Sequence, residues 1–366
     1  MIRQRIQPTL IVIVILLIAA LIVVFIQRSR ESAQLAACRE RLGNLAQAVR
    51  RYAEMNKSIP PGYLGPNPDR KEMSPAPYVG TFVYLLPHLL SDDDPVWVEP
   101  YYQADISAKT DERSQLKPPA NIPWWELTNP ATNVSNRTLA RRQFSFLLCP
   151  SVAREPVTEG MIVGLHSYGT KGYFDGFLQR KLISLKEDPD IVHWGVTHYL
   201  PVAGRCGTDD PFAGHFTNRS GQFGSVATLL TSGSLLFGEA LGGYEPEPVS
   251  KKLIRKTAYS WFCGPLPTYY GLPEWTHRPW NAFNGPHPKG VLFAWADGSV
   301  GIFRRSFEED EIHKSGWDDN PPKLIQTLVM KKGNTVDIGS PAWSFLQGCA
   351  SRAHGLHHFY PQNTID

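Results

Sequence analysis

The chain has 366 residues, of which 42% are hydrophobic and 11% aromatic, so it can bury a sizeable core and is not a disordered chain. Its 37 basic and 34 acidic residues nearly cancel, which excludes nucleic acid as the main partner. The 30 glycines and 31 prolines favour many turns over an all-helical bundle, and 5 cysteines do not make a disulfide scaffold.

The N-terminus carries an unbroken apolar run. Residues 10–26 read LIVIVILLIAALIVVFI, and as a helix they span about 26 Å, close to the ~30 Å hydrocarbon core of a bilayer. The polar residues 27–31 that follow lack the small-residue cleavage site of a signal peptide, so the sequence predicts a retained anchor in the membrane lipid bilayer. The segment LAAC at 35–38 looks like a lipoprotein box, and lipidation of Cys38 is the alternative; polar residues separate this box from the apolar run.

Beyond the run, apolar residues continue at helical spacing. We therefore predict one helix from Thr9 to about Asn56, ended by the segment SIPPG at 58–62. The apolar stripe lasts only about three heptads, so docking on the chain's own head is favoured over a coiled coil. The stripe is formed by Leu35, Cys38, Leu42, Leu45, Val49 and Tyr52.

The rest of the chain reads as β-rich with long loops. Short apolar stretches between turn signals stand at residues 82–86, 144–148, 226–230, 235–237 and 253–258, and residues 323–332 suit a short helix. The strongest local signal is Asp297-Gly298 between the apolar stretches 291–296 and 299–303. It predicts a β-hairpin in which both turn residues have positive φ.

Five stretches, in one order along the chain, resemble a known family. Residues 29–45 are similar to its N-terminal helix "AREAAR…C…NLKQ", and His287 stands nine residues before Asp297-Gly298. The chain thus resembles the bacterial prepilin-like family with a C-terminal H-X9-DG domain, whose function is unknown and whose helix is of the general secretion pathway G type, as in type IV pilins and pseudopilins. The other three stretches are SIPPG at 58–62, FLLCPS at 146–151 and TSGSLLFGE at 231–239.

The resemblance implies an α+β fold in which a long transmembrane-plus-amphipathic, pilin-like helix carries an antiparallel β-rich extracytoplasmic head. It implies a single-pass inner (cytoplasmic) membrane protein with its N-terminus in the cytoplasm, although the arginines around the apolar run favour the opposite orientation. The expected segments are a short cytoplasmic N-terminus at 1–8, the helix at 9–57, the head at 58–345 and a polar tail at 346–366.

By the same resemblance, the protein is a pseudopilin-like structural or interaction component of the cell envelope or secretion apparatus. Pilin-like or secretion-system proteins are its possible partners. The prepilin cleavage site departs from the family pattern: Gln7, Pro8 and Val12 stand where the family has Gly, Phe and Glu. Processing at Pro8 and a chain that begins at Met1 or Ile2 therefore both stay open.

Cys38 and Cys149 coincide with the two cysteines of that family. Because both are expected outside the cytoplasm, a disulfide that ties the helix to the head is one hypothesis. Two buried free thiols are the other.

No enzyme signature is present: the chain has no G-x-S-x-G, H-E-x-x-H, C-x-x-C or P-loop motif, and no cofactor or metal is expected. We interpret His287, Asp297 and Gly298 as structural; a catalytic role for His287 and Asp297 requires that both line one cleft. The acidic run 92–94 and the histidines at 354, 357 and 358 are interpreted as solvated segments rather than metal sites.

The alternative function is an envelope binding protein that holds a glycan or small solute in its head. Trp124 and Trp125 lie in a predicted loop, and exposed indole rings can stack on sugars.

Overall fold

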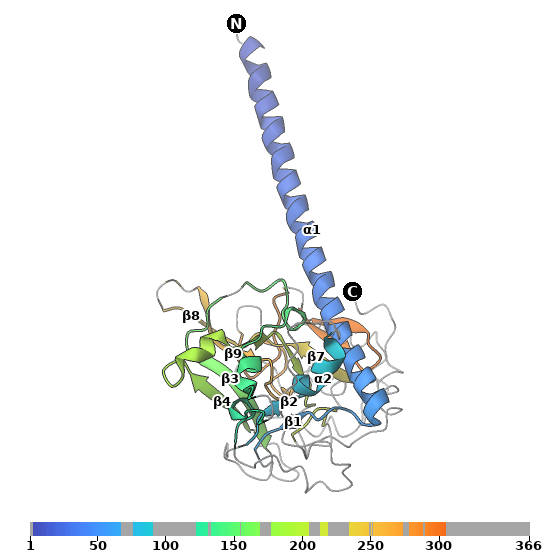
Figure 1. Ribbon diagram of the computed structural model, residues 1–366. Coiled ribbons are helices and arrows are strands. Elements are labelled where there is room, and N and C mark those ends of the chain that lie inside the picture. Colours follow the sequence, from blue (N-terminus) through green and yellow to red (C-terminus); the bar gives the residue numbers. More distant parts are fainter. Residues whose placement is uncertain are drawn as a thin grey trace, which may run out of the picture.

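The computed structural model describes residues 3–66, 76–90, 122–130, 133–153, 155–168, 177–204, 213–218, 234–248, 250, 252–273, 278–287 and 290–304. In this part of the chain, one long helix stands on a β-rich head (Figure 1). The fold is therefore α+β. Residues 92–94, the apolar stretch 226–230, the predicted helix 323–332, the polar tail and its histidines lie outside the described residues.

Helix α1 runs from Arg3 to Asn56. Its 54 residues correspond to about 81 Å. The helix ends at the predicted residue but begins at Arg3, six residues before the predicted start at Thr9. From Val12 to Ile26 the large apolar side chains are exposed on all sides. Among the described residues, α1 is the one helix that is long enough and apolar enough to cross a membrane.

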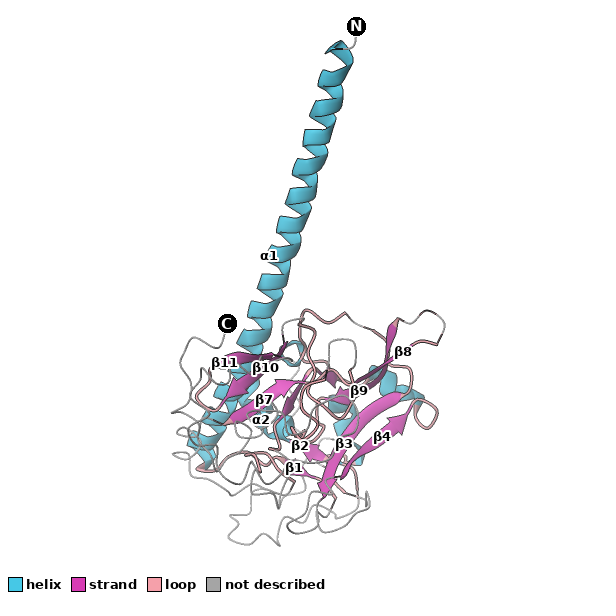
Figure 2. Cartoon of the chain, turned by 180° about the vertical axis from the view of Figure 1, so that it is seen from behind, coloured by secondary structure: helices cyan, strands magenta, loops and turns pink. Residues whose placement is uncertain are grey.

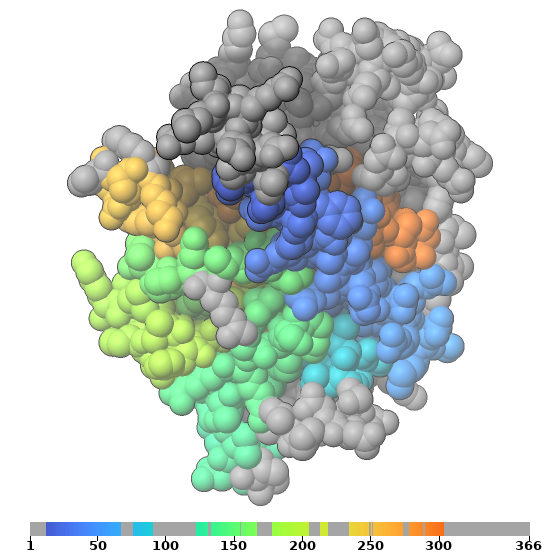
Figure 3. Space-filling view, turned by 90° about the horizontal axis from the view of Figure 1, so that it is seen from above, coloured from blue at the N-terminus to red at the C-terminus, as the bar shows by residue number. Residues whose placement is uncertain are grey.

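The second half of α1 is packed against the head, as predicted. Its contacts are with α2 (Thr81–Leu89), β7 (Leu235–Glu239), β10 (Gly290–Trp295) and β11 (Val300–Arg304). Figure 3 shows α1, in blue, beside the orange C-terminal strands. The buried side chains of this half include the middle of the predicted stripe and three alanines: Cys38, Leu42, Leu45, Ala46, Ala48, Val49 and Ala53.

Two larger sheets make up the head (Figure 2). The sheet next to α1 is antiparallel throughout and has the order β11-β10-β7-β6, where β6 is Tyr199–Pro201. The other sheet has the order β4-β3-β9-β5, with β8 paired to β9. Its strands are β3 (Gly160–Tyr168), β4 (Phe177–Ser184), β5 (Val196–Thr197), β8 (Gly243–Pro246) and β9 (Leu253–Ser260).

The second sheet corrects one expectation. Strands β3 and β9 are parallel, so the head is mixed rather than wholly antiparallel. The β3–β4 hairpin was not predicted at all, because Gly164, His166 and Ser167 interrupt the apolar pattern of β3. The remaining elements are short: β1 (Tyr63–Leu64) paired to β2 (Val79–Gly80), α3 (Asn136–Ala140), and the 3-10 turns η2 (Trp124–Glu126), η3 (Ser145–Leu147) and η4 (Pro189–His193).

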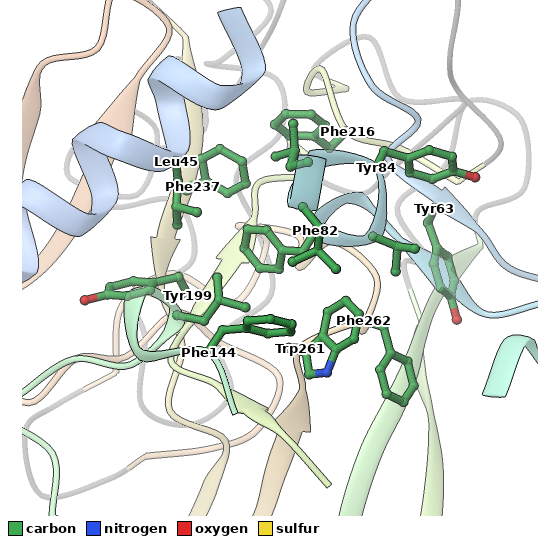
Figure 4. Close-up of a cluster of buried hydrophobic side chains, with 14 of the residues drawn as sticks. Leu45, Tyr63, Phe82, Tyr84, Phe144, Tyr199, Phe216, Phe237, Trp261 and Phe262 are labelled. Carbon is green, nitrogen blue, oxygen red and sulfur yellow. The ribbon is translucent and has the colours of Figure 1, made fainter. Parts of the chain in front are cut away.

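Not every predicted apolar stretch is a strand. Residues 235–237 and 253–258 lie in β7 and β9, but 82–86 belong to helix α2 and 144–148 surround the turn η3. A short apolar run has the same periodicity in a buried helix as in a buried strand, so the pattern alone does not distinguish them. In α2, Phe82 stacks on Phe237 of β7, with ring centroids 5.4 Å apart (Figure 4).

The Trp124-Trp125 pair lies inside the core rather than on an exposed loop. The two side chains are 0% and 4% exposed. Trp124 contacts Trp261 and Phe262, with ring centroids 5.6 and 5.2 Å apart. These indoles therefore offer no platform for a sugar, and the expectation of an exposed stacking surface at this pair is wrong.

The predicted hairpin is present, but its turn is of a different type. The N–H of Gly298 donates to the carbonyl of Trp295 at 3.0 Å, and only Gly298 of the two turn residues has a positive φ, +91°. This is a type I turn followed by a left-handed glycine, a common three-residue hairpin loop. The carboxylate of Asp297 accepts the backbone N–H of Ser299 at 2.9 Å and its hydroxyl at 2.7 Å, which stabilises Asp297 without a positive φ.

Substitution of Gly298 should isolate the cost of this backbone conformation. A methyl group there would meet nothing closer than the Arg50 guanidinium, 4.0 Å away, so no clash contributes. We expect Gly298→Ala to lower the free energy of unfolding by about 1–2 kcal/mol, and Gly298→Asn by less, because asparagine tolerates the left-handed region. Urea unfolding of the three chains tests this; equal losses for Ala and Asn would contradict the backbone explanation.

Candidate functional site

The segment 148–150 of the head is tied to one face of α1. Cys149 is joined to Cys38 in a disulfide, with the Cα atoms 5.3 Å apart. One turn of α1 further on, Arg41 donates to the carbonyl of Leu148, and one turn earlier Gln34 donates to the carbonyl of Pro150 at 3.4 Å. Residues three or four apart share one face of a helix, so three consecutive turns of α1 hold this one loop. The structure thus brings the two predicted cysteines together.

Next to the disulfide lies a buried carboxylate. Glu239 ends β7 and is 0% exposed. Its Oε2 accepts the backbone N–H of Leu292 on the neighbouring strand β10 at 2.9 Å. Gly285 leaves the space for this oxygen, because a Cβ there would lie 2.3 Å from Oε2. A carboxylate buried this deeply needs polar partners in its surroundings.

His287, just before β10, faces this carboxylate. Its Nε2 lies 3.2 Å from Oε1 of Glu239 and 3.8 Å from Sγ of Cys149. The ligand atoms of Cys38, Cys149, Glu239 and His287 all lie within 4.8 Å of one another, and all four residues are buried. We call these four residues the seam cluster, since they come from α1, the 148–150 loop, β7 and the segment before β10.

Two uncharged side chains, His198 and Tyr199, lie beside the seam cluster. His198 accepts the backbone N–H of Cys149 at its Nδ1, 3.1 Å away. Burial, and secondarily the charge of Arg255, lowers the pKa of His198 well below its usual range, so the ring is uncharged. Burial, and then the carboxylate of Glu239, raises the pKa of Tyr199. The hydroxyl of Tyr199 therefore stays protonated beside the cluster.

The H-X9-DG motif does not form one site. His287 lies three residues before β10, whereas Asp297 lies in the exposed turn beyond its end. The six residues of β10, about 20 Å of strand, separate the two, so they lie beyond opposite ends of this strand. Instead, the turn seats the hairpin on α1: Arg50 donates to the carbonyl of Asp297 at 3.1 Å. His287 belongs to the seam cluster.

Sequence reasoning missed Glu239. In the sequence it is the last residue of the stretch TSGSLLFGE, and no role was predicted for it. One sequence feature could have indicated its role: it is a charged residue at the end of an otherwise apolar strand, and a carboxylate buried there needs a polar partner. That partner, His287, is 48 positions away in the chain, and nothing in the spacing links the two.

The geometry is not that of a nucleophile activated by a base. In a catalytic triad one ring nitrogen of the histidine faces the nucleophile and the other faces the carboxylate. Here Nε2 of His287 faces both Cys149 and Glu239. The sulfur of Cys149 is also committed to the disulfide.

Cys263 is the third cysteine of the described chain and takes no part in the seam cluster. It is buried and free, and burial raises the pKa of its thiol, which makes it unreactive.

No protein-family model matches this chain, and no significant match is found among curated proteins or solved structures. Its class is therefore defined by its own architecture: an α+β head on an N-terminal helix long and apolar enough to serve as a membrane or signal anchor.

Proposed function

We propose that this protein is a membrane-anchored, pseudopilin-like structural or interaction component of the cell envelope or secretion apparatus, as its resemblance to the H-X9-DG prepilin-like family suggests. The observation that carries the proposal is the division of α1. Residues Val12 to Ile26 expose apolar side chains on every face, while the turns from Cys38 to Ala53 are buried under the head. One continuous helix thus joins an apolar anchor to a docked domain, which is the organisation of pilin-like proteins.

The disulfide supports the proposed location. Structural disulfides persist in oxidising compartments outside the cytoplasm. Cys38 lies about 18 Å along the helix from Ile26, since 12 residues separate them. The head would then stand directly on the outer surface of the inner membrane, with the N-terminus in the cytoplasm. In this arrangement Cys38 is part of the helix–head junction, and its sulfur is not available for a lipid.

Membrane topology tests the first part of the proposal. After alkaline carbonate washing of membranes, the full chain should stay in the pellet. Protease added to spheroplasts should remove the head, while protease added from the cytoplasmic side should leave it intact. N-terminal sequencing of the same material tells a permanent anchor, which begins at Met1 or Ile2, from a chain processed at Pro8. Release by carbonate or protection of the head in spheroplasts would contradict the proposal.

Photo-crosslinking tests the interaction role. Phe25 and Met55 are equally exposed on α1, at 74% and 73%, but only Phe25 lies in the apolar run. A photoreactive residue at position 25 should capture a second copy of this chain or another helix-anchored envelope protein. The same residue at position 55 is the matched control and should not capture the same species. If position 25 captures lipid alone, the protein has an anchor but no partner in the membrane.

A further inference from the structure

The seam cluster has the composition of a transition-metal site. Two cysteines, a histidine and a glutamate supply the sulfur, nitrogen and oxygen atoms that bind Zn²⁺ in proteins. With thiolates in the set, the site favours Zn²⁺ or a similar soft-to-borderline ion over Ca²⁺ or Mg²⁺, which prefer oxygen ligands.

The distances fit a tetrahedron. Zinc–ligand bonds of about 2.0–2.3 Å place the ligand atoms of a tetrahedral site about 3.3–3.8 Å apart. Oε1 of Glu239 lies 3.2 Å from Nε2 of His287, and that nitrogen lies 3.8 Å from Sγ of Cys149. Two edges of the tetrahedron are thus already set within the head. The S–S bond between Cys38 and Cys149 is shorter than a tetrahedral edge, and the remaining ligand pairs lie within 4.8 Å.

A second observation concerns the carboxylate. Glu239 is 0% exposed, yet no described residue gives its Oε1 a hydrogen bond of acceptable geometry. The other oxygen, Oε2, is held by the N–H of Leu292, which fixes the carboxylate and aims Oε1 into the seam cluster. A buried carboxylate oxygen that converges with a histidine nitrogen on two sulfurs is what a metal site requires.

We propose that, when Cys38 and Cys149 are reduced, the seam cluster binds one divalent transition-metal ion of the zinc type. The disulfide and the metal exclude each other, because metal ligation needs both sulfurs as thiolates. The junction between α1 and the head is then closed either by a covalent bond or by a metal ion. Since all four side chains are buried, the metal enters while the chain folds with its thiols reduced, before oxidation takes place.

A phosphine can supply the two electrons that convert the disulfide form into the reduced form that binds metal. The phosphine takes up one oxygen from water and becomes a phosphine oxide, while the disulfide gains two electrons and two protons and becomes two thiols. Binding of the metal ion then releases the two thiol protons to solvent. With two thiolates, one carboxylate and a neutral imidazole, the loaded site carries one net negative charge, and Arg41 at the Leu148 carbonyl stands nearby.

Cobalt substitution tests the proposal on the full chain in detergent. Cys206 and Cys349, outside the described residues, are first replaced by serine so that no other ligand pair contributes. The chain is unfolded and reduced with a phosphine, then refolded with one equivalent of Co²⁺. This should give thiolate-to-cobalt charge transfer and the visible bands of a tetrahedral ion, and refolding with Zn²⁺ also present should suppress both. The oxidised chain should give neither signal. Histidines of the tail can bind Co²⁺ but produce no thiolate charge transfer.

Variants assign the ligands. Glu239→Gln and His287→Gln should each weaken Co²⁺ binding by more than about tenfold. Cys38→Ala should abolish the two-thiolate spectrum, while Cys263→Ala should leave it unchanged. An unchanged spectrum in Cys38→Ala, or unchanged affinity in both Gln variants, would overturn the proposal.

A measurement on the chain with all four ligands intact guards against variants that fail to fold. Zn²⁺ should protect the reduced thiols of Cys38 and Cys149 from alkylation and from reoxidation, as read from peptide masses. Equal modification with and without Zn²⁺, or charge transfer absent from the reduced chain, would equally overturn the proposal.

Discussion

Replacing Leu45 by alanine should lower the free energy of unfolding of the head by about 2–5 kcal/mol, the usual cost of a large-to-small change in a core. Leu45 belongs to the buried stripe of α1 and is 0% exposed, in the same core as Phe82 and Phe237 (Figure 4). The loss has two parts: the transfer energy of the removed methyl groups and the cavity that the rigid helix cannot close. Denaturant unfolding of the full chain in detergent, followed by tryptophan fluorescence, measures it, because all 10 tryptophans lie outside α1.

Leu21→Ala is the matched control on the same helix. Leu21 is 69% exposed in the apolar run, so the same change of side chain removes no packing from the head. The unfolding free energy of the head should then move by less than about 0.5 kcal/mol. Similar losses for the two variants would mean that the head does not depend on the docked half of α1.

The sequence predicted what local patterns control. The apolar stripe from Cys38 to Val49, the end of α1 at Asn56 and the Asp297-Gly298 hairpin all follow from spacing and turn chemistry within a few residues. Each of these features is determined by residues close together in the sequence. An apolar stripe needs only some core to pack against, and a turn needs only its own few residues.

What the sequence could not predict depends on partners far apart in the chain. The parallel pairing of β3 with β9 joins residues about a hundred positions apart, and no local pattern specifies it. The sequence neighbours of Trp124 predict a loop, but its environment is set by Trp261 and Phe262. The seam cluster is of the same kind. Cysteine positions suggested one contact, but Glu239 and His287 became visible only once β7 and β10 were adjacent.

Loss of the Cys38–Cys149 bond should destabilise the head by several kcal/mol. The bond closes a loop across 111 positions, and chain entropy alone gives about 4.7 kcal/mol for a loop of about 100 residues. The double variant Cys38→Ala/Cys149→Ala and the phosphine-reduced original chain should lose similar amounts in unfolding titrations with a chelator present. Cys263→Ala, which removes a buried thiol but no cross-link, should cost only about 1 kcal/mol.

The chelator is what makes this comparison informative, since reduction has two consequences at this junction. It removes the covalent tie, and it also frees two thiols beside Glu239 and His287. If the seam cluster then binds Zn²⁺, free metal at about 100 times its dissociation constant should restore about 2.7 kcal/mol to the reduced chain. It should restore nothing to the double alanine variant, which lacks the two sulfurs. Equal stability of the oxidised and the chelator-treated reduced chain would show instead that Arg41, Gln34 and the buried stripe hold the helix to the head without the bond.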